Sequence, residues 1–256
     1  MKRYDFLGVA GAGKTTLVQQ LKRKSAAMLP AAAVDLAVSR TITQSHDTSW
    51  KHRLLAYVPY LQASLRNSIV TKGESIAFAR FSEINNTFLA TVHEMLSQSS
   101  RSQYRRAEGY YHFLRTVRRI AFLEQWMVGE GVLFDESLSQ KVYAVMPSDH
   151  GNEVQARRYF EKMPLPTALI HLDADAIQVV RQVRERELAT GKLIPGHRGL
   201  NDEDLLRSTE ASLDIARIGA ECLHARGCAV LTLAASEAID NNALKVCLFL
   251  ENQSLK

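Results

Sequence analysis

The sequence has little cysteine, glycine and proline, and no long apolar run. The chain of 256 residues has three cysteines, Cys222, Cys228 and Cys247, and no CxxC pair. This excludes a disulfide-stapled scaffold and a cysteine-based zinc site. Gly 13 and Pro 6 exclude collagen-like and low-complexity classes. No run reaches the roughly 18 apolar residues of a membrane-spanning helix, and the longest, residues 30–38, contains Asp35. We therefore expect a cytoplasmic globular protein with no membrane segment.

The charge has only a small excess of one sign. The chain has 32 Lys+Arg and 27 Asp+Glu, which gives a net charge of +5. This excess suits an anionic ligand; a nucleic-acid partner is compatible with it but is not favoured. With 46% hydrophobic residues, the chain is long enough for one sizeable core. We predict one domain over residues 1–256, and the sequence is compatible with a homodimer.

The first motif lies close to the N-terminus. Residues 4–10 predict a short strand that runs into Gly8–Thr15, a full match to GxxxxGK[ST], and helical spacing follows from Thr16. Gly11 and Gly13 allow backbone conformations in which successive N–H groups face an anion. Lys14 would reach the β- and γ-phosphates of ATP, and the Thr15 hydroxyl would bind Mg²⁺. The predicted nucleotide-binding residues are Gly8, Gly11, Ala12, Gly13, Lys14, Thr15 and Thr16.

Hydrophobic periodicity divides the rest of the chain into strands and helices. Apolar runs predict further strands at 31–39, 132–136, 167–172 and 228–233, although the alanines of 31–39 leave a helix as the alternative. Helical spacing covers about 50–127, with a polar break at 97–102, and returns at 175–188, 202–225 and 237–252. This alternation predicts an α/β protein of three layers with a five-stranded parallel sheet and a large helical insertion, about 45–128.

Asp135 and Glu136 end the predicted strand at 132–136. An apolar run that ends in Asp-Glu is typical of a Walker B strand, whose carboxylate emerges at the carboxyl edge of the sheet. Phosphoryl transfer needs a metal ligand and a base for the acceptor. We expect Asp135 to serve as the Mg²⁺ ligand or as the base, with Glu136 in the other role. A pair that only starts the next helix is the alternative.

An arginine-rich segment follows the strand at 167–172. Arg181 and Arg184 are three residues apart and share a helix face, whereas Arg186 is displaced from it. Such a helix, leading into a loop that contains His197 and Arg198, could close over transferring phosphates. A solvated face of Arg–Glu pairs is the alternative.

These motifs together resemble the nucleoside and nucleotide kinase group of P-loop proteins, in particular thymidylate kinase and the deoxynucleoside kinases. The resemblance covers residues 2–20 and about 132–235. It implies the P-loop NTPase fold with strand order 2-3-1-4-5, and a lid at about 181–200 in which Arg181 and Arg184 bind phosphate, with Arg186 or Arg198 as further candidates. The family carries an arginine in the acidic motif, but this chain has Asp135-Glu136-Ser137. Substrate identity therefore does not transfer.

In such a fold the segment between the first and third strands builds the acceptor pocket. Arginines interleaved with aromatic residues occupy 101–119, and arginine binds phosphate or carboxylate in bidentate fashion. The candidate substrate residues are Arg40, Arg105, Arg106 and Arg115. A helix with a basic solvent face is the alternative here.

The sequence therefore predicts an ATP- and Mg²⁺-dependent phosphotransferase for a small, anionic acceptor such as a nucleoside, nucleotide or sugar derivative. The catalytic candidates are Lys14, Asp135, Glu136, Arg181 and Arg184. Two alternatives remain: a polynucleotide or glycan kinase, and a nucleotide-switched ATPase or binding protein. No Asn-Lys-x-Asp motif follows the strand at 228–233, which argues against a GTP switch.

Overall fold

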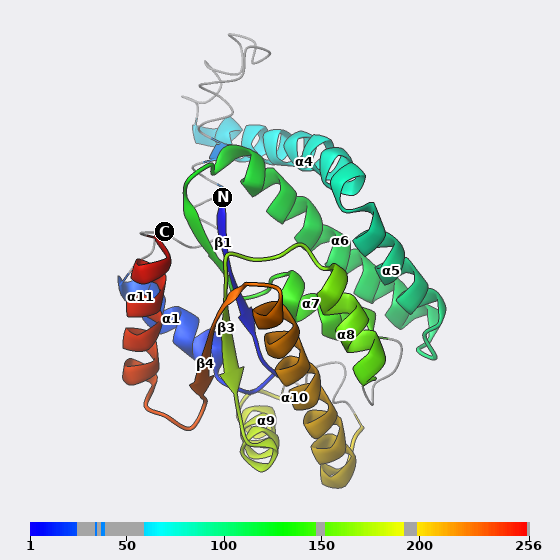
Figure 1. The fold of residues 1–256 in the computed structure, drawn as a ribbon, viewed down its shortest axis with the longest axis vertical. Helices are drawn as coiled ribbons and strands as arrows, with labels where there is room; N and C mark the ends of the chain where they lie inside the picture. Colours follow the sequence, from blue (N-terminus) through cyan, green and yellow to red (C-terminus); the bar gives the residue numbers. More distant parts are fainter. Residues whose placement is uncertain (25–33, 35–36, 39–58, 147–151, 192–198, 255–256) are drawn as a thin grey trace.

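The centre of the molecule is a parallel sheet. The computed structural model describes residues 1–24, 34, 37–38, 59–146, 152–191 and 199–254 (Figure 1). Within them the strands are β1 (Lys2–Leu7), β2 (Gly131–Phe134), β3 (Ala168–Asp173) and β4 (Ala229–Ala234), in the order β2-β1-β3-β4. β1 is central: Tyr4 is in register with Leu133 of β2 and with Ala168 of β3. The predicted α/β class and parallel sheet are confirmed.

The sheet has four strands in the described residues, and the prediction of five is wrong. Most of the expected strand at 31–39 lies outside the described residues, and the three that are described, Val34, Ala37 and Val38, are helical and buried. The segment is rich in alanine, the residue with the highest helix propensity, which favours this outcome. With that strand removed, the expected order of the other four strands equals the observed order.

Helices cover both faces of the sheet (Figure 1). On one face α1 (Lys14–Lys24) packs against α11 (Ile239–Ser254). On the other face α7 (Leu138–Val145) contacts β1, α10 (Asp202–Ala225) contacts β3 and β4, and α8 (Glu153–Lys162) packs against both helices. Burial from two sides explains the apolar runs of β2 and β3, whereas the central β1 also carries Lys2, Arg3 and Asp5. α9 (Ala176–Thr190) lies at the carboxyl end of the strands.

A helical block precedes β2, as the periodicity predicts, and within the described residues it is divided into three helices. It consists of α4 (Pro59–Ile84), α5 (Asn86–Ser97) and α6 (Gln103–Trp126), and residues 45–58 of the expected insertion lie outside the described part. The break at 97–102 is confirmed, since α5 ends at Ser97 and the Ser102 side chain caps α6 by accepting from the Arg105 N–H. α6 packs against α4 and α7, so one face of the block reaches the helix that follows β2.

None of the helices in the described ranges is both long and apolar enough to cross a bilayer.

Candidate functional site

The turn after β1 has the backbone geometry that the motif predicts. Gly11 and Gly13 have φ angles of +96° and +89°, a region that side chains with a Cβ rarely adopt. The turn delivers the chain into α1, which begins at Lys14. The first N–H groups of a helix have no acceptor within it, and the helix dipole favours an anion there. The loop can therefore surround a phosphate with backbone donors.

A cavity of about 400 Å³ opens beside this turn. Because β2 and β3 flank β1 in a parallel sheet, the segments that leave all three strands meet at one edge. The cavity is lined by the loop and start of α1, by the end of β2, and by α7 and α9: Ala10, Gly11, Gly13, Lys14, Thr15, Thr16, Asp135, Glu136, Gln140, Gln182 and Arg186. The structure thus brings most of the predicted nucleotide-binding residues together with Asp135 and Glu136. Gly8 and Ala12 belong to the same loop but do not line the cavity.

The Lys14 ammonium is folded back onto the loop. Its Nζ donates to the carbonyl oxygens of Gly8 at 2.5 Å and Val9 at 2.7 Å. Burial lowers its pKa to about 8, against the opposing effect of the Glu136 and Asp135 charges. The ammonium therefore remains charged at neutral pH.

Asp135 and Glu136 are both exposed at the end of β2 but differ in their partners. The Glu136 N–H donates to Asp135 Oδ1 at 3.0 Å, and Lys141 Nζ donates to Glu136 Oε2 at 2.8 Å. The hydrogen bond from Lys141 holds the pKa of Glu136 below its usual value, helped by the charges of Arg115 and His112 and opposed by desolvation. Among the described residues no cation forms an ion pair with Asp135.

The donors around the cavity fit Mg²⁺ bound together with a triphosphate. The predicted ligands Thr15 and Asp135 are exposed oxygen donors that line the same cavity. Mg²⁺ usually takes one or two protein oxygens and completes its shell with phosphate oxygens and water. The described residues contain no cluster of three or more His, Cys, Asp or Glu side chains that could hold a metal without such help.

On α9 the structure places a different arginine in the cavity from the two predicted. Arg184 donates to Asp202 Oδ1 at 2.8 Å and to the Leu200 carbonyl at 2.7 Å. Arg181 is 71% exposed and lies 3.7 Å from Glu185. Neither lines the cavity, whereas Arg186 does. Residues 192–198, with His197 and Arg198 of the expected lid, lie outside the described residues.

The rotation of α9 about its own axis explains why Arg186 lines the cavity and Arg181 and Arg184 do not. Val179 and Val183 pack against the loop, and a Cβ on Gly11 would come within 3.0 Å of Val183 Cγ2. With this valine face fixed inward, Gln182 and Arg186, which are four residues apart, share the neighbouring face and meet the cavity. Gln182 and Gln140 could not be predicted as site residues, because an uncharged amide gives no signal in the sequence.

Of the four predicted acceptor arginines, three belong to the described residues. Arg40 lies outside the described residues. Arg115 of α6 is close enough to Glu136 to lower its pKa, but like Arg105 and Arg106 it does not line the cavity. Other arginines of the same stretch serve the fold: Arg101 donates to the Tyr143 and Ala144 carbonyls, Arg118 lies over the Phe78 ring and Arg119 pairs with Glu74.

The chain matches no protein-family model and, at a significant level, no curated protein.

Proposed function

We propose that this chain has the P-loop NTPase fold and transfers the γ-phosphate of Mg-ATP to a small anionic acceptor. One observation carries the proposal: the Gly8–Thr15 loop and the Asp135–Glu136 pair line one cavity beside the central strand. In open parallel sheets, ligands bind at this carboxyl edge, where the connections diverge to either side. The volume of about 400 Å³ is in the range of small-molecule sites.

The residues at the cavity match the needs of phosphoryl transfer, which are positioning and neutralisation of charge. The loop N–H groups and Lys14 would hold the phosphates, and Thr15 would bind Mg²⁺. Arg186 would neutralise charge on the transferring group. Asp135 is better suited than Glu136 to the metal or to the acceptor hydroxyl, because Glu136 is already paired with Lys141.

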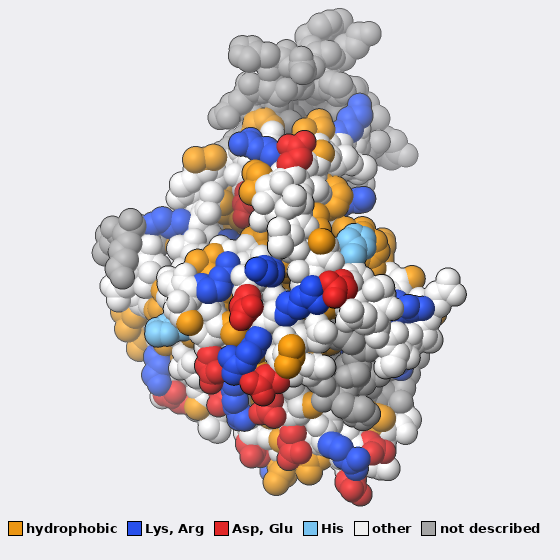
Figure 2. Space-filling model, turned by 45° about the vertical axis from the view of Figure 1, so that its right-hand side comes forward, with side chains coloured by type: hydrophobic (Ala, Val, Ile, Leu, Met, Phe, Trp, Pro, Cys, Tyr) orange, Lys and Arg blue, Asp and Glu red, His pale blue; other side chains and the backbone are white. Residues whose placement is uncertain are grey.

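A small acceptor is favoured over a polymer. Arg101, Arg118 and Arg119 are engaged within the protein, which removes half of the six arginines at 101–119 from contact with a charged backbone. Figure 2 brings forward the side that bears α5, α8 and α10 and shows basic and acidic side chains interspersed there. On α8 Arg157 pairs with Glu153, and on α10 Arg217 pairs with Asp214. A polymer groove would instead need a continuous basic stripe.

The test is ATP consumption against a panel of nucleosides, nucleotides, sugars, sugar phosphates and oligonucleotides. We expect stimulation by one class of small acceptor, and Lys14→Ala should abolish both tight Mg-ATP binding and turnover. Lys162→Ala, which removes an exposed cation of α8 outside the cavity, is the matched control. Wild-type turnover in Lys14→Ala would refute the proposal. ATP binding without stimulation by any acceptor would favour a nucleotide-switched protein instead.

The role of the acidic pair is tested separately. Asp135→Asn should keep Mg-ATP affinity within about tenfold and lose transfer, because loop and Lys14 still hold the phosphates. Equal transfer by this variant and the wild type would remove Asp135 from the reaction.

A further inference from the structure

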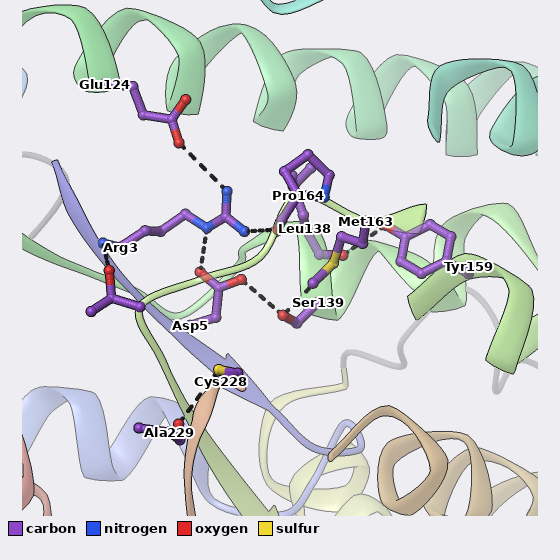
Figure 3. A network of polar contacts seen from close by, with 11 residues as sticks. Arg3, Asp5, Glu124, Leu138, Ser139, Tyr159, Met163, Pro164, Cys228 and Ala229 are labelled. Atoms are coloured by element: carbon purple, nitrogen blue, oxygen red, sulfur yellow. Dashed lines mark hydrogen bonds and ion pairs between the residues drawn. The ribbon is translucent and has the colours of Figure 1, made fainter. Parts of the chain in front are cut away.

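A buried ion pair lies within the central strand β1, upstream of the loop (Figure 3). Arg3 and Asp5 of β1 are 3% and 0% exposed, and Arg3 Nε lies 3.2 Å from Asp5 Oδ1. Arg3 also donates to the Pro164 carbonyl, and its Nη1 lies 3.6 Å from Glu124 Oε1. Apolar side chains of similar volume often serve stability as well as a buried pair does, because desolvation offsets its attraction. A role in positioning would explain why charged groups occupy this place.

The second oxygen of Asp5 reaches the helix that follows the acidic pair. Ser139 Oγ of α7 donates to Asp5 Oδ2 at 2.8 Å, and both side chains are fully buried. In the same turn, the Tyr159 hydroxyl donates to the Leu138 carbonyl at 2.8 Å. The first turn of α7 is thus attached to the strand that carries the loop, by a hydrogen bond whose carboxylate acceptor makes it short and directional.

The two residues after Ser139 both contact the candidate site. Gln140 Nε2 donates to the Gly8 carbonyl at 2.9 Å, which fixes the first residue of the loop. Lys141 Nζ donates to Glu136 at 2.8 Å. Successive helical residues point about 100° apart, so residues 139, 140 and 141 face the strand, the loop and the acidic pair in turn. A rotation of this turn would break both contacts together.

We propose that Asp5 and Ser139 are positioning residues, which hold the first turn of α7 so that Gln140 and Lys141 keep the loop and Glu136 in place. Asp5 does not line the cavity, so it acts through α7 and has no contact with nucleotide or acceptor. The expected effect on phosphoryl transfer rests on the proposed function; the attachment of the helix does not.

The cleanest variant is Ser139→Ala, since Asp5→Ala would leave the Arg3 guanidinium buried without its carboxylate. Tyr143→Phe is the matched control, because it also removes one hydroxyl of α7, whose bond goes to the Ser212 carbonyl. We expect Ser139→Ala to lower kcat about tenfold, as small displacements of reacting groups do. Tyr143→Phe should leave kcat within about twofold at a similar melting temperature. Equal losses of kcat in the two variants would overturn the proposal.

A double-mutant cycle tests whether Ser139 acts through Gln140. We expect Ser139→Ala to raise the dissociation constant of Mg-ATP in the wild-type background and to add little in a Gln140→Leu background, since coupled residues are non-additive. Additive effects would overturn the proposal, because a general loss of stability does not depend on Gln140.

Amide hydrogen exchange tests the attachment of α7 to β1 even if the chain transfers no phosphate. We expect faster exchange in residues 137–141 and 8–13 of Ser139→Ala than of Tyr143→Phe. Identical exchange in both variants would refute the attachment of α7 to β1. If no acceptor stimulates ATP consumption but exchange differs clearly between the two variants, only the proposed function is refuted.

Discussion

The two sides of the cavity hold their charged groups in different ways. The α9 side contributes Gln182 and Arg186, and within the described residues the Arg186 guanidinium forms no ion pair. The α7 side contributes Gln140 and the Glu136–Lys141 pair, with Arg115 of α6 nearby. The side chains on the α7 side are therefore held in place by contacts with the protein before any ligand binds. Under the proposed function, Arg186 on the α9 side would neutralise charge on the transferring phosphate, whereas Arg115 and the Glu136–Lys141 pair on the α7 side would orient the acceptor.

The difference also shows that residue type alone does not decide what an arginine does. Arg184 and Arg186 are two residues apart on α9, yet one joins α9 to the start of α10 through Asp202 and the other faces the cavity. Four variants test this division between the two sides.

The largest effect is expected on the α9 side. Arg186→Ala should lower kcat by about 100-fold, the usual cost of removing a donor that stabilises charge in the transition state. Arg181→Ala removes the same charge from the same helix but outside the cavity, and should leave kcat within about twofold. Steady-state kinetics measure both. Equal losses of kcat in Arg186→Ala and Arg181→Ala would mean that the overall positive charge of α9 matters, and not the position of Arg186.

The α7 side should respond through acceptor binding. Arg115→Ala should raise the acceptor KM about tenfold, equivalent to ~1.4 kcal/mol, and leave the ATP KM unchanged, because Arg115 lies near Glu136 and not at the loop. Arg118→Ala is the control on the same helix, since that guanidinium lies over Phe78. An equal rise in the KM for ATP would place Arg115 with the phosphates and remove the distinction between the two sides.

How far the sequence could predict this site depends on how local each feature is. The loop was predictable because Gly8–Thr15 are contiguous and their residue types dictate the backbone. Asp135 and Glu136 were predictable because they end an apolar strand, and parallel strands align their carboxyl ends.

Features that depend on packing were not predictable in the same way. The pattern of α9 gives its spacing but not its rotation about its axis, which the contact of Val183 with Gly11 determines; Arg181 and Arg184 were therefore chosen over Arg186. The helix α8 was not expected, and the segment 31–39 was assigned to the sheet although its alanines suit a helix. The hydrogen bond from Ser139 to Asp5 joins residues 134 positions apart, so no local sequence pattern predicts it.

A change of pH should distinguish the two sides with a smaller effect. Lys141 holds the pKa of Glu136 low, so Glu136 loses its charge only well below neutral pH. In Lys141→Met this pKa rises, and activity that needs ionised Glu136 is lost at a higher pH as the solution is acidified. The acid limb of the kcat/KM profile, measured from roughly pH 4 to 7, should therefore move towards neutrality. Arg186→Ala should leave this limb where it is, and a similar movement in that variant would show that the limb does not report Glu136.

The smallest effect is expected for the arginine of α9 that serves the fold. The Arg184 side chain is 27% exposed and joins Glu187, Asp202 and the Leu200 carbonyl, so Arg184→Ala should lower the melting temperature by about 2–4 °C while kcat stays within about twofold. Arg207→Ala removes an exposed pair with Glu203 and should change the melting temperature by about 1 °C or less, because surface pairs contribute little. Thermal denaturation and steady-state kinetics measure the two quantities on the same samples. A large loss of kcat in Arg184→Ala at unchanged stability would restore this residue to the transfer step, and the separation of roles along α9 would fail.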